Sequence, residues 1–246
     1  MRWSWLALGA GVAAAAAVTV ATLRLTSSRP LELREGAIPW GVLGDSDSHI
    51  YRDPVLGTRR GGDHHAVTFQ WTEILDLLRG DQVNQGPRGR WGTRGIVARL
   101  RDRLGWTARM PPKYDFRYNF ALSGARCSSL VSGWSGQARW MANHIRQDPE
   151  GWGRGVVVVR IGVNDLGQRS HLEAYARSGL TPGIRNVLGG CVAETAAALE
   201  MILDASPGVR VLLVGIADDT AWPSDETEPR SPEELRRMAT VLTAYD

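Results

Sequence analysis

The sequence has very little lysine and cysteine, and its last 75 residues contain no histidine. Lys113 is the only lysine among 29 basic residues, and no histidine follows His171. The basic charge is therefore carried by scattered arginines, and the formal net charge is only +3. A nucleic-acid-binding surface needs clustered positive charge, so this composition argues against a nucleic-acid partner. The two cysteines, Cys127 and Cys191, either form a disulfide in an oxidising compartment or are separate buried thiols.

One long apolar run stands at the N-terminus. Residues 3–23 are almost uninterrupted apolar residues, and Arg24 closes the run. Its length reaches the roughly 20 residues that a bilayer span needs, so it predicts a signal peptide or a transmembrane anchor. We therefore expect three parts: the export segment at 1–24, a polar linker at 25–36 and a folded domain at 37–246. This organisation predicts a periplasmic or extracellular protein that contacts the membrane through its N-terminal segment.

The folded part has the length and composition of one α/β domain. The chain has 246 residues, of which 43% are hydrophobic, which suffices for a single buried core. Strands and helices alternate along it, which is typical of a doubly wound parallel sheet with helices on both faces, a three-layer α/β/α arrangement. The Gly-rich residues 79–95 are expected to form a long ordered loop or lid. The expected strands are 38–44, 115–125, 155–165 and 208–218, and the expected helices are 67–80, 93–105, 128–146, 184–206 and 231–246.

Three of the expected strands end in polar sequences that contain glycine. These sequences lie at 44–46, 123–125 and 162–165. In parallel α/β sheets, ligands bind beyond the carboxyl ends of the strands, so we expect the three sequences to meet there. Acyl transfer needs a nucleophile and donors for the developing oxyanion. Ser46 can supply a hydroxyl and its own N–H, Gly124 a backbone N–H, and Asn164 a side-chain amide.

These sequences resemble the first three signature blocks of the SGNH/GDSL hydrolases. The blocks are GDSDS from Gly44, NFALSGA from Asn119 and IGVNDLG from Ile161, in the family's order. The resemblance implies a flavodoxin-like sheet and hydrolysis of an ester bond without a metal or organic cofactor. It also implies an acyl-enzyme on Ser46, with Gly124 and Asn164 as oxyanion donors. We expect Asp45 to fix the turn that carries Ser46.

The resemblance lacks its fourth element. That family places an Asp-x-x-His segment after one further strand, whereas this sequence ends at Asp246. We therefore expect a C-terminally truncated domain, without its last strand and catalytic histidine, and at best weakly active. The histidines present are expected to be packing or solvated residues rather than the base. They are His49, His64, His65, His144 and His171.

Two other functions fit parts of the pattern. The Asp45-x-Asp47 sequence also resembles the motif of haloacid-dehalogenase-type phosphatases, in which Asp45 would attack phosphorus and Asp218–Asp219 would hold Mg²⁺. That family expects a lysine after the Ser123 block, but Lys113 precedes it. If the base is truly absent, a non-catalytic module that binds acyl or glycan ligands is the other alternative. The alternative to a nucleophilic role for Ser46 is a structural one, in which Ser46 caps the N-terminus of the next helix.

The substrate is not specified by any residue pattern. An extracytoplasmic site is compatible with small-molecule, glycan or lipid esters. We expect specificity to reside in residues 57–95, because loops over strand ends usually carry it.

Overall fold

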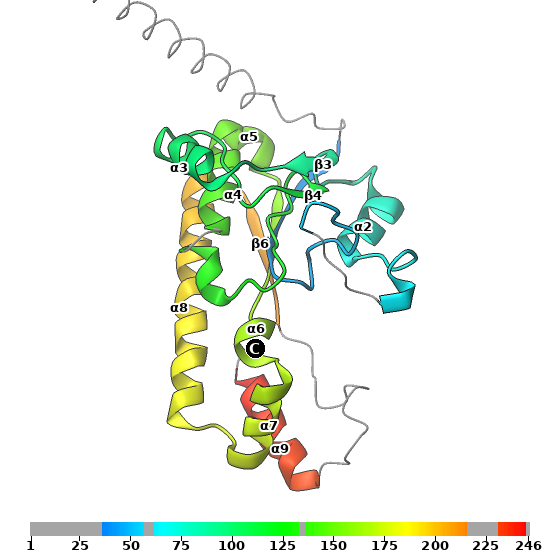
Figure 1. Ribbon diagram of the computed structural model, residues 1–246. Coiled ribbons are helices and arrows are strands. Elements are labelled where there is room, and N and C mark those ends of the chain that lie inside the picture. Colours follow the sequence, from blue (N-terminus) through cyan, green and yellow to red (C-terminus); the bar gives the residue numbers. More distant parts are fainter. Residues whose placement is uncertain (1–35, 57–61, 133–135, 216–230, 245–246) are drawn as a thin grey trace, which may run out of the picture. The chain divides into compact units, whose positions relative to one another are not determined.

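A computed structural model describes residues 36–56, 62–132, 136–215 and 231–244 (Figure 1). The chain divides into two units, Met1–Glu32 and Leu33–Asp246, and the described residues belong to the second. The predicted export segment at 1–24 lies outside the described residues, as do most of the predicted linker and Asp218–Asp219.

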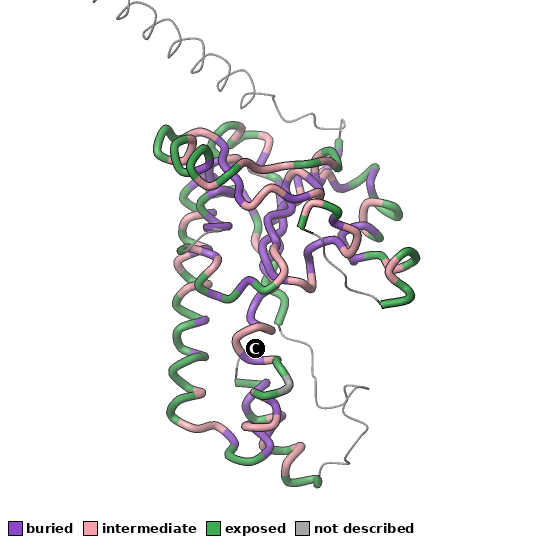
Figure 2. Tube along the Cα trace, viewed as in Figure 1, coloured by how far each residue is buried: buried purple, intermediate pink, exposed green. Residues whose placement is uncertain are grey.

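The centre of the domain is a four-stranded parallel sheet. Its strands are β2 (Val83–Asn84), β1 (Ile38–Gly44), β5 (Val156–Arg160) and β6 (Arg210–Val214), in that order. The run of four valines in β5 explains its central place, because β-branched residues suit a strand that is covered on both faces. Figure 2 shows the buried residues concentrated along β1 and β5. The predicted α/β class and parallel sheet are confirmed.

The strand order places a switch point between β1 and β5. From β1 the chain passes first to β2 on one side, and later to β5 on the other side. The connections leave in opposite directions, so the carboxyl ends of β1 and β5 border the crevice where doubly wound sheets bind ligands.

Two helices pack on each other, and one of them also packs on the sheet. They are α4 (Gln137–Gln147), which also contacts β1, and α8 (Pro182–Ala205), and both lie on the same side in Figure 1. Among the described residues, α8 is the helix that is long and apolar enough to cross a membrane, but here it packs as a helix of the domain. The other helices are α2 (Trp71–Arg79), α3 (Gly95–Arg103), α5 (Pro149–Trp152), α6 (Val163–Leu166), α7 (Arg169–Ser178) and α9 (Pro232–Thr243), with 3₁₀ turns η1 (Gly62–His64) and η2 (Cys127–Leu130).

The C-terminal helix begins as its sequence predicts. Ser231 caps α9 by accepting a hydrogen bond from the Glu234 N–H, the Glu234 carboxylate accepts one from the Ser231 N–H, and Pro232 occupies the first turn. Helix α9 packs on α7 through a small apolar cluster. Its members are Leu172, Tyr175, Ala176, Met238, Val241 and Leu242.

Three predicted elements need correction. The helix expected at 128–146 is replaced by η2 and by α4, which starts after Gly136 in a left-handed conformation that interrupts a helix. The loop expected at 79–95 contains β2 and β3 (Arg88–Trp91). The strand expected at 115–125 is β4 (Lys113–Phe116), which pairs antiparallel with β3, followed by residues 118–122 beside β1. Short paired segments like these have too few residues to show a period.

Residues 116–121 are held by buried cations in place of a full strand partner. Arg109 donates to the carbonyls of Phe116, at 3.2 Å, and Asn119. Lys113, which is 2% exposed, donates to the Ala121 carbonyl and to Asp115, at 2.7 Å. Burial lowers the pKa of Lys113 to about 7, against the opposing effect of the Asp115 carboxylate. The single lysine is therefore a core residue that supports the chain leading to Gly124.

Replacing Lys113 with methionine is expected to destabilise the domain strongly. The Lys113→Met variant leaves the buried Asp115 without its cation and the Ala121 carbonyl without a donor, a loss of about 3–5 kcal/mol for a broken buried pair. Urea denaturation would measure it, with exposed Arg99→Met as the control that stays within about 0.5 kcal/mol of the parent. A loss in Lys113→Met no larger than that of the control would contradict the supporting role.

Candidate active site

The three polar sequences meet around the carboxyl end of β1. Gly44 pairs with Arg160 of β5 on one edge of β1. On the opposite edge, the Gly44 carbonyl accepts a hydrogen bond of 3.0 Å from the Leu122 N–H. Ser46, Gly124 and Asn164 each follow one of these three paired residues by a few positions. The structure therefore brings the three predicted site segments to one end of the sheet.

Asp45 joins the first of these segments to the third. Its carboxylate accepts hydrogen bonds from the Asp47 N–H, at 2.9 Å, and from the Val163 N–H at the start of α6. Asp45 is 1% exposed, and burial raises its pKa to about 6, helped by the nearby Asp47 carboxylate. Residues 45–49 form one turn, in which the N–H groups of Ser48 and His49 donate to the Asp45 carbonyl. These contacts agree with the expectation that Asp45 fixes the turn.

Gly44 allows this junction to form. A Cβ at this position would collide with the carbonyl oxygen of Arg160 and approach the Ser48 hydroxyl. The Gln137 side chain, from the start of α4, exchanges two hydrogen bonds with the Gly44 backbone, of 2.8 and 2.9 Å. Arg160 in turn pairs with Asp47 at 3.2 Å. The strand end is thus fixed from the sheet and from α4 at once.

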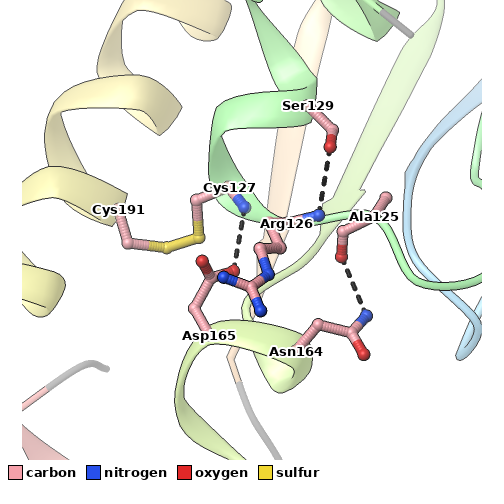
Figure 3. Close-up of a disulfide and its surroundings, with 7 residues drawn as sticks. All are labelled: Ala125, Arg126, Cys127, Ser129, Asn164, Asp165 and Cys191. Carbon is pink, nitrogen blue, oxygen red and sulfur yellow. Dashed lines mark hydrogen bonds between the residues drawn. A yellow bond between two sulfur atoms is a disulfide. The ribbon is translucent and has the colours of Figure 1, made fainter. Parts of the chain in front are cut away.

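Asn164 and Asp165 hold the loop that contains Gly124. The Asn164 side-chain NH₂ donates to the Ala125 carbonyl at 2.8 Å, and the Cys127 N–H donates to the Asp165 carboxylate at 2.9 Å (Figure 3). An amide nitrogen carries two hydrogens, so Asn164 retains a second donor for a ligand. Gly124 is exposed with φ +79°, and a Cβ there would meet no atom within 4 Å. Open space therefore faces Gly124.

Cys127 and Cys191 form a disulfide. It joins η2, which follows the Gly124 loop, to helix α8, and the two cysteines have a sequence separation of 64. Of the two sequence interpretations, the paired one is therefore correct. Within the described ranges, one set of three or more His, Cys, Asp or Glu side chains has its possible metal-ligand atoms within 4.8 Å of one another. This set is Cys127, Asp165 and Cys191. Their sulfur atoms are bonded to each other, so the group does not offer thiolates to a metal.

Three of the five histidines contact residues outside the turn at 45–49, and the other two lie in the segment that contains η1. His49 is fully buried, with Ser123 and Asp53 at its two ring nitrogens. His144 lies against the rings of Tyr118 and Phe120, and His171 stacks on Tyr175. His64 and His65 lie in and directly after η1.

Several residues that shape the site carry no sequence signal of their own. Asn119 donates to the Ser48 carbonyl at 2.8 Å and accepts from the Ala121 N–H, which ties the second block to the first. Gln70, at the start of α2, donates to the carbonyls of Ser46 and His49 at 3.1 and 3.2 Å. Asn119 is the first residue of the NFALSGA block, so the sequence alone could have identified it. Gln70 and Gln137 lie in helix starts whose partners are remote in sequence, so no local pattern identifies them.

Comparison with protein families gives a match over most of the chain. The GDSL-like Lipase/Acylhydrolase family pattern matches residues 76–245. This range includes Gly124 and Asn164, but it begins after the turn that carries Ser46. No curated protein and no solved structure matches the chain.

Removing the disulfide is expected to destabilise the domain around the Gly124 loop. Closing a loop of this length contributes about 4 kcal/mol in the chain-entropy description. The double variant Cys127→Ala/Cys191→Ala should therefore melt at a lower temperature than the parent. Adding a reductant should lower the melting temperature of the parent and leave that of the variant unchanged. A parent whose melting temperature ignores the reductant would contradict a stabilising disulfide.

Proposed function

Because the chain belongs to the GDSL-like lipase/acylhydrolase family, we propose that it hydrolyses ester bonds through an acyl-enzyme formed on Ser46. The supporting observation is the meeting of three strand-end segments around Gly44. A hydroxyl, the backbone N–H of the exposed Gly124 and an uncharged amide donor belong to these segments. This is the set that acyl transfer requires.

In the proposed reaction, the Ser46 oxygen attacks the acyl carbon and gives up its proton to a base. The carbonyl oxygen becomes an oxyanion, which the N–H groups of Ser46 and Gly124 and the Asn164 amide would stabilise. The bond to the leaving alcohol then breaks, and that alcohol takes up a proton. Water then attacks the acyl carbon in the same way, and the bond to the Ser46 oxygen breaks, which releases the acid and restores the Ser46 hydroxyl. The proposed site uses no metal and no organic cofactor.

The turnover of this chain is proposed to be low. A serine hydroxyl is a poor nucleophile without an adjacent base. His49, the histidine nearest to Ser46 in sequence, has both ring nitrogens engaged by Ser123 and Asp53. An oxyanion site alone still accelerates such reactions by about 10³–10⁴ over water. Ester turnover that equals that of other family members would contradict this part of the proposal.

The alternative phosphatase function receives less support. Asp45 is buried and is used as an acceptor for two backbone N–H groups, whereas a nucleophile must face the substrate. Lys113 is a core residue paired with Asp115. A non-catalytic binding module would use the same cleft, and the labelling experiment below separates it from a hydrolase.

We propose an extracytoplasmic location for this activity, with the N-terminal segment holding the protein at the membrane. The apolar run at 3–23 supports it, and so does the disulfide, which persists in oxidising compartments. The substrate would be a small-molecule, glycan or lipid ester.

Labelling with a fluorophosphonate tests the nucleophile. The reagent forms a bond from the serine oxygen to phosphorus and releases fluoride, and peptide mapping locates the adduct. We expect labelling on Ser46, which is lost in Ser46→Ala and kept in the control Ser132→Ala, whose exposed hydroxyl donates to the Ser128 carbonyl. Labelling that survives in Ser46→Ala, or a parent chain that reacts no faster than its unfolded form, would overturn the proposal.

Asn164 tests the oxyanion site. Removal of one oxyanion donor typically costs about 10²–10³-fold in rate. Asn164→Ala should therefore slow labelling or ester hydrolysis by about that factor. The control is Gln168→Ala, one turn further along, whose side chain reaches Asn164 only at 3.5 Å. A loss in the control equal to that in Asn164→Ala would show that the effect does not come from the Asn164 donor.

A further inference from the structure

His49 is a buried ionisable side chain next to the proposed site. Its Nδ1 lies 2.8 Å from the Ser123 hydroxyl and 3.3 Å from the Ser123 backbone nitrogen, and its Nε2 lies 3.0 Å from a carboxylate oxygen of Asp53. The histidine and the aspartate side chains are both fully buried. The proposed mechanism uses none of these three residues.

The donors around His49 determine its protonation. A backbone N–H can only donate, so the nitrogen that faces the Ser123 N–H must be an acceptor. Nδ1 therefore carries no proton, and the Ser123 hydroxyl donates to it as well. The proton of the neutral ring lies on Nε2 and is donated to Asp53. Buried polar groups paired in this way are rigid, because any other arrangement leaves a donor or acceptor without a partner.

Asp53 is itself fixed by the backbone. Its second carboxylate oxygen accepts hydrogen bonds from the Val55 N–H at 2.8 Å and from the Tyr114 N–H, at the start of β4, at 3.0 Å. A continuous set of hydrogen bonds thus leads from β4 through Asp53 and His49 to Ser123.

Ser123 precedes Gly124, whose N–H lies in the peptide that the two residues share. On the far side, Ala125 is held by Asn164 and by a 2.9 Å bond from its N–H to the Leu122 carbonyl. Gly124 itself is exposed, has no Cβ and adopts φ +79°, so its own side chain restrains nothing. The direction of the Gly124 N–H therefore depends on how firmly its two neighbours are held.

We propose that His49, supported by Asp53, is a positioning residue that sets the direction of the Gly124 N–H by holding Ser123 through two hydrogen bonds to its Nδ1. This inference rests on the proposed role of Gly124 as an oxyanion donor. His49 touches neither substrate nor reacting atoms and acts through Ser123. Small displacements of a positioned group can reduce rates by about 10²-fold, so the effect should be visible in the rate of Ser46 labelling.

Two substitutions at position 49 separate the functions of the ring nitrogens. In His49→Asn, the side-chain oxygen occupies the place of Nδ1 and keeps the acceptor for Ser123, while the contact with Asp53 is lost. In His49→Gln, the longer amide reaches Asp53 and leaves Ser123 without its acceptor. Both variants remove one buried partner and should lose comparable stability in urea denaturation.

We expect fluorophosphonate labelling of Ser46 to slow by about 10- to 100-fold in His49→Gln and to stay within about threefold of the parent in His49→Asn. His144→Gln is the matched control, because His144 packs on Tyr118 and Phe120 of the same segment without reaching Ser123. It should lose stability and keep its labelling rate. Equal losses of rate in both His49 variants, or a rate that simply follows stability in all three proteins, would overturn the positioning role.

A second measurement does not depend on catalysis. The amide NMR signal of Gly124 should shift in His49→Gln and keep its parental position in His49→Asn. A parent that does not label at Ser46 while the signal shifts as expected would overturn the proposed nucleophile and leave the structural coupling intact. An unchanged Gly124 signal in His49→Gln would overturn the coupling, even with Ser46 labelled normally. An adduct on Ser123 would overturn both, because Ser123 would then be a nucleophile with His49 as its base.

The pH dependence gives a third readout with a defined sign. Burial lowers the pKa of His49, and the Lys113 cation acts in the same direction, while Asp53 and Asp115 oppose it. The neutral ring, and the stability that it contributes, are thus fully present above the ordinary histidine pKa of 6.5 and are lost as the pH falls below it. Labelling of the parent should decline in that acidic range. His49→Asn has no ionisable group at this position, so its decline should be smaller, and an identical decline would contradict the proposal.

Discussion

The parallel pairing of β1 with β5 is the constraint on which the site depends. It brings Gly44 level with Arg160 so closely that only a glycine fits, and it leaves the turn at 45–49 directly beside the start of α6. Asp45 and the pair formed by Arg160 and Asp47 then lock the two strand ends together. Two segments that are more than a hundred residues apart in sequence thereby share one crevice at the switch point of the sheet.

The other wall of the crevice is built differently. Residues 118–122 meet β1 through only a few hydrogen bonds. Arg109 and Lys113 donate to carbonyls of this segment, the Asn119 side chain ties it to the Ser48 carbonyl, and His49 holds the adjoining Ser123. These groups are buried, so each carries a desolvation cost that is offset only while its partner is in place. Such a wall is rigid, but a single substitution can destabilise it, because the loss of one buried side chain leaves a charge or a carbonyl unpaired. This property suits the role proposed for the Gly124 loop, which is to present a backbone N–H in a fixed direction.

The family assignment and the geometry support the proposal from different parts of the chain. The family pattern covers Gly124 and Asn164, whereas the turn that bears Ser46 lies outside it and joins the site through β1. The disulfide adds a connection from the Gly124 loop to α8. Acyl transfer is the chemistry that uses all of these features together, because it needs a hydroxyl and several donors around one oxygen atom.

The sequence by itself determined the elements whose signals are local. The bounds of β1, the valine run of β5 and the cap of α9 follow from runs of apolar residues and from capping residues, and the three polar strand ends were visible as motifs. Tertiary structure alone decided the pairing of the two cysteines, the division of 128–146 into η2 and α4, and the short strands β2 to β4. It also decided that Lys113 and His49 are core residues with partners 2 to 74 positions away. The physical reason is that burial and hydrogen bonding depend on which segments meet in space, and residues such as these show no period along the chain.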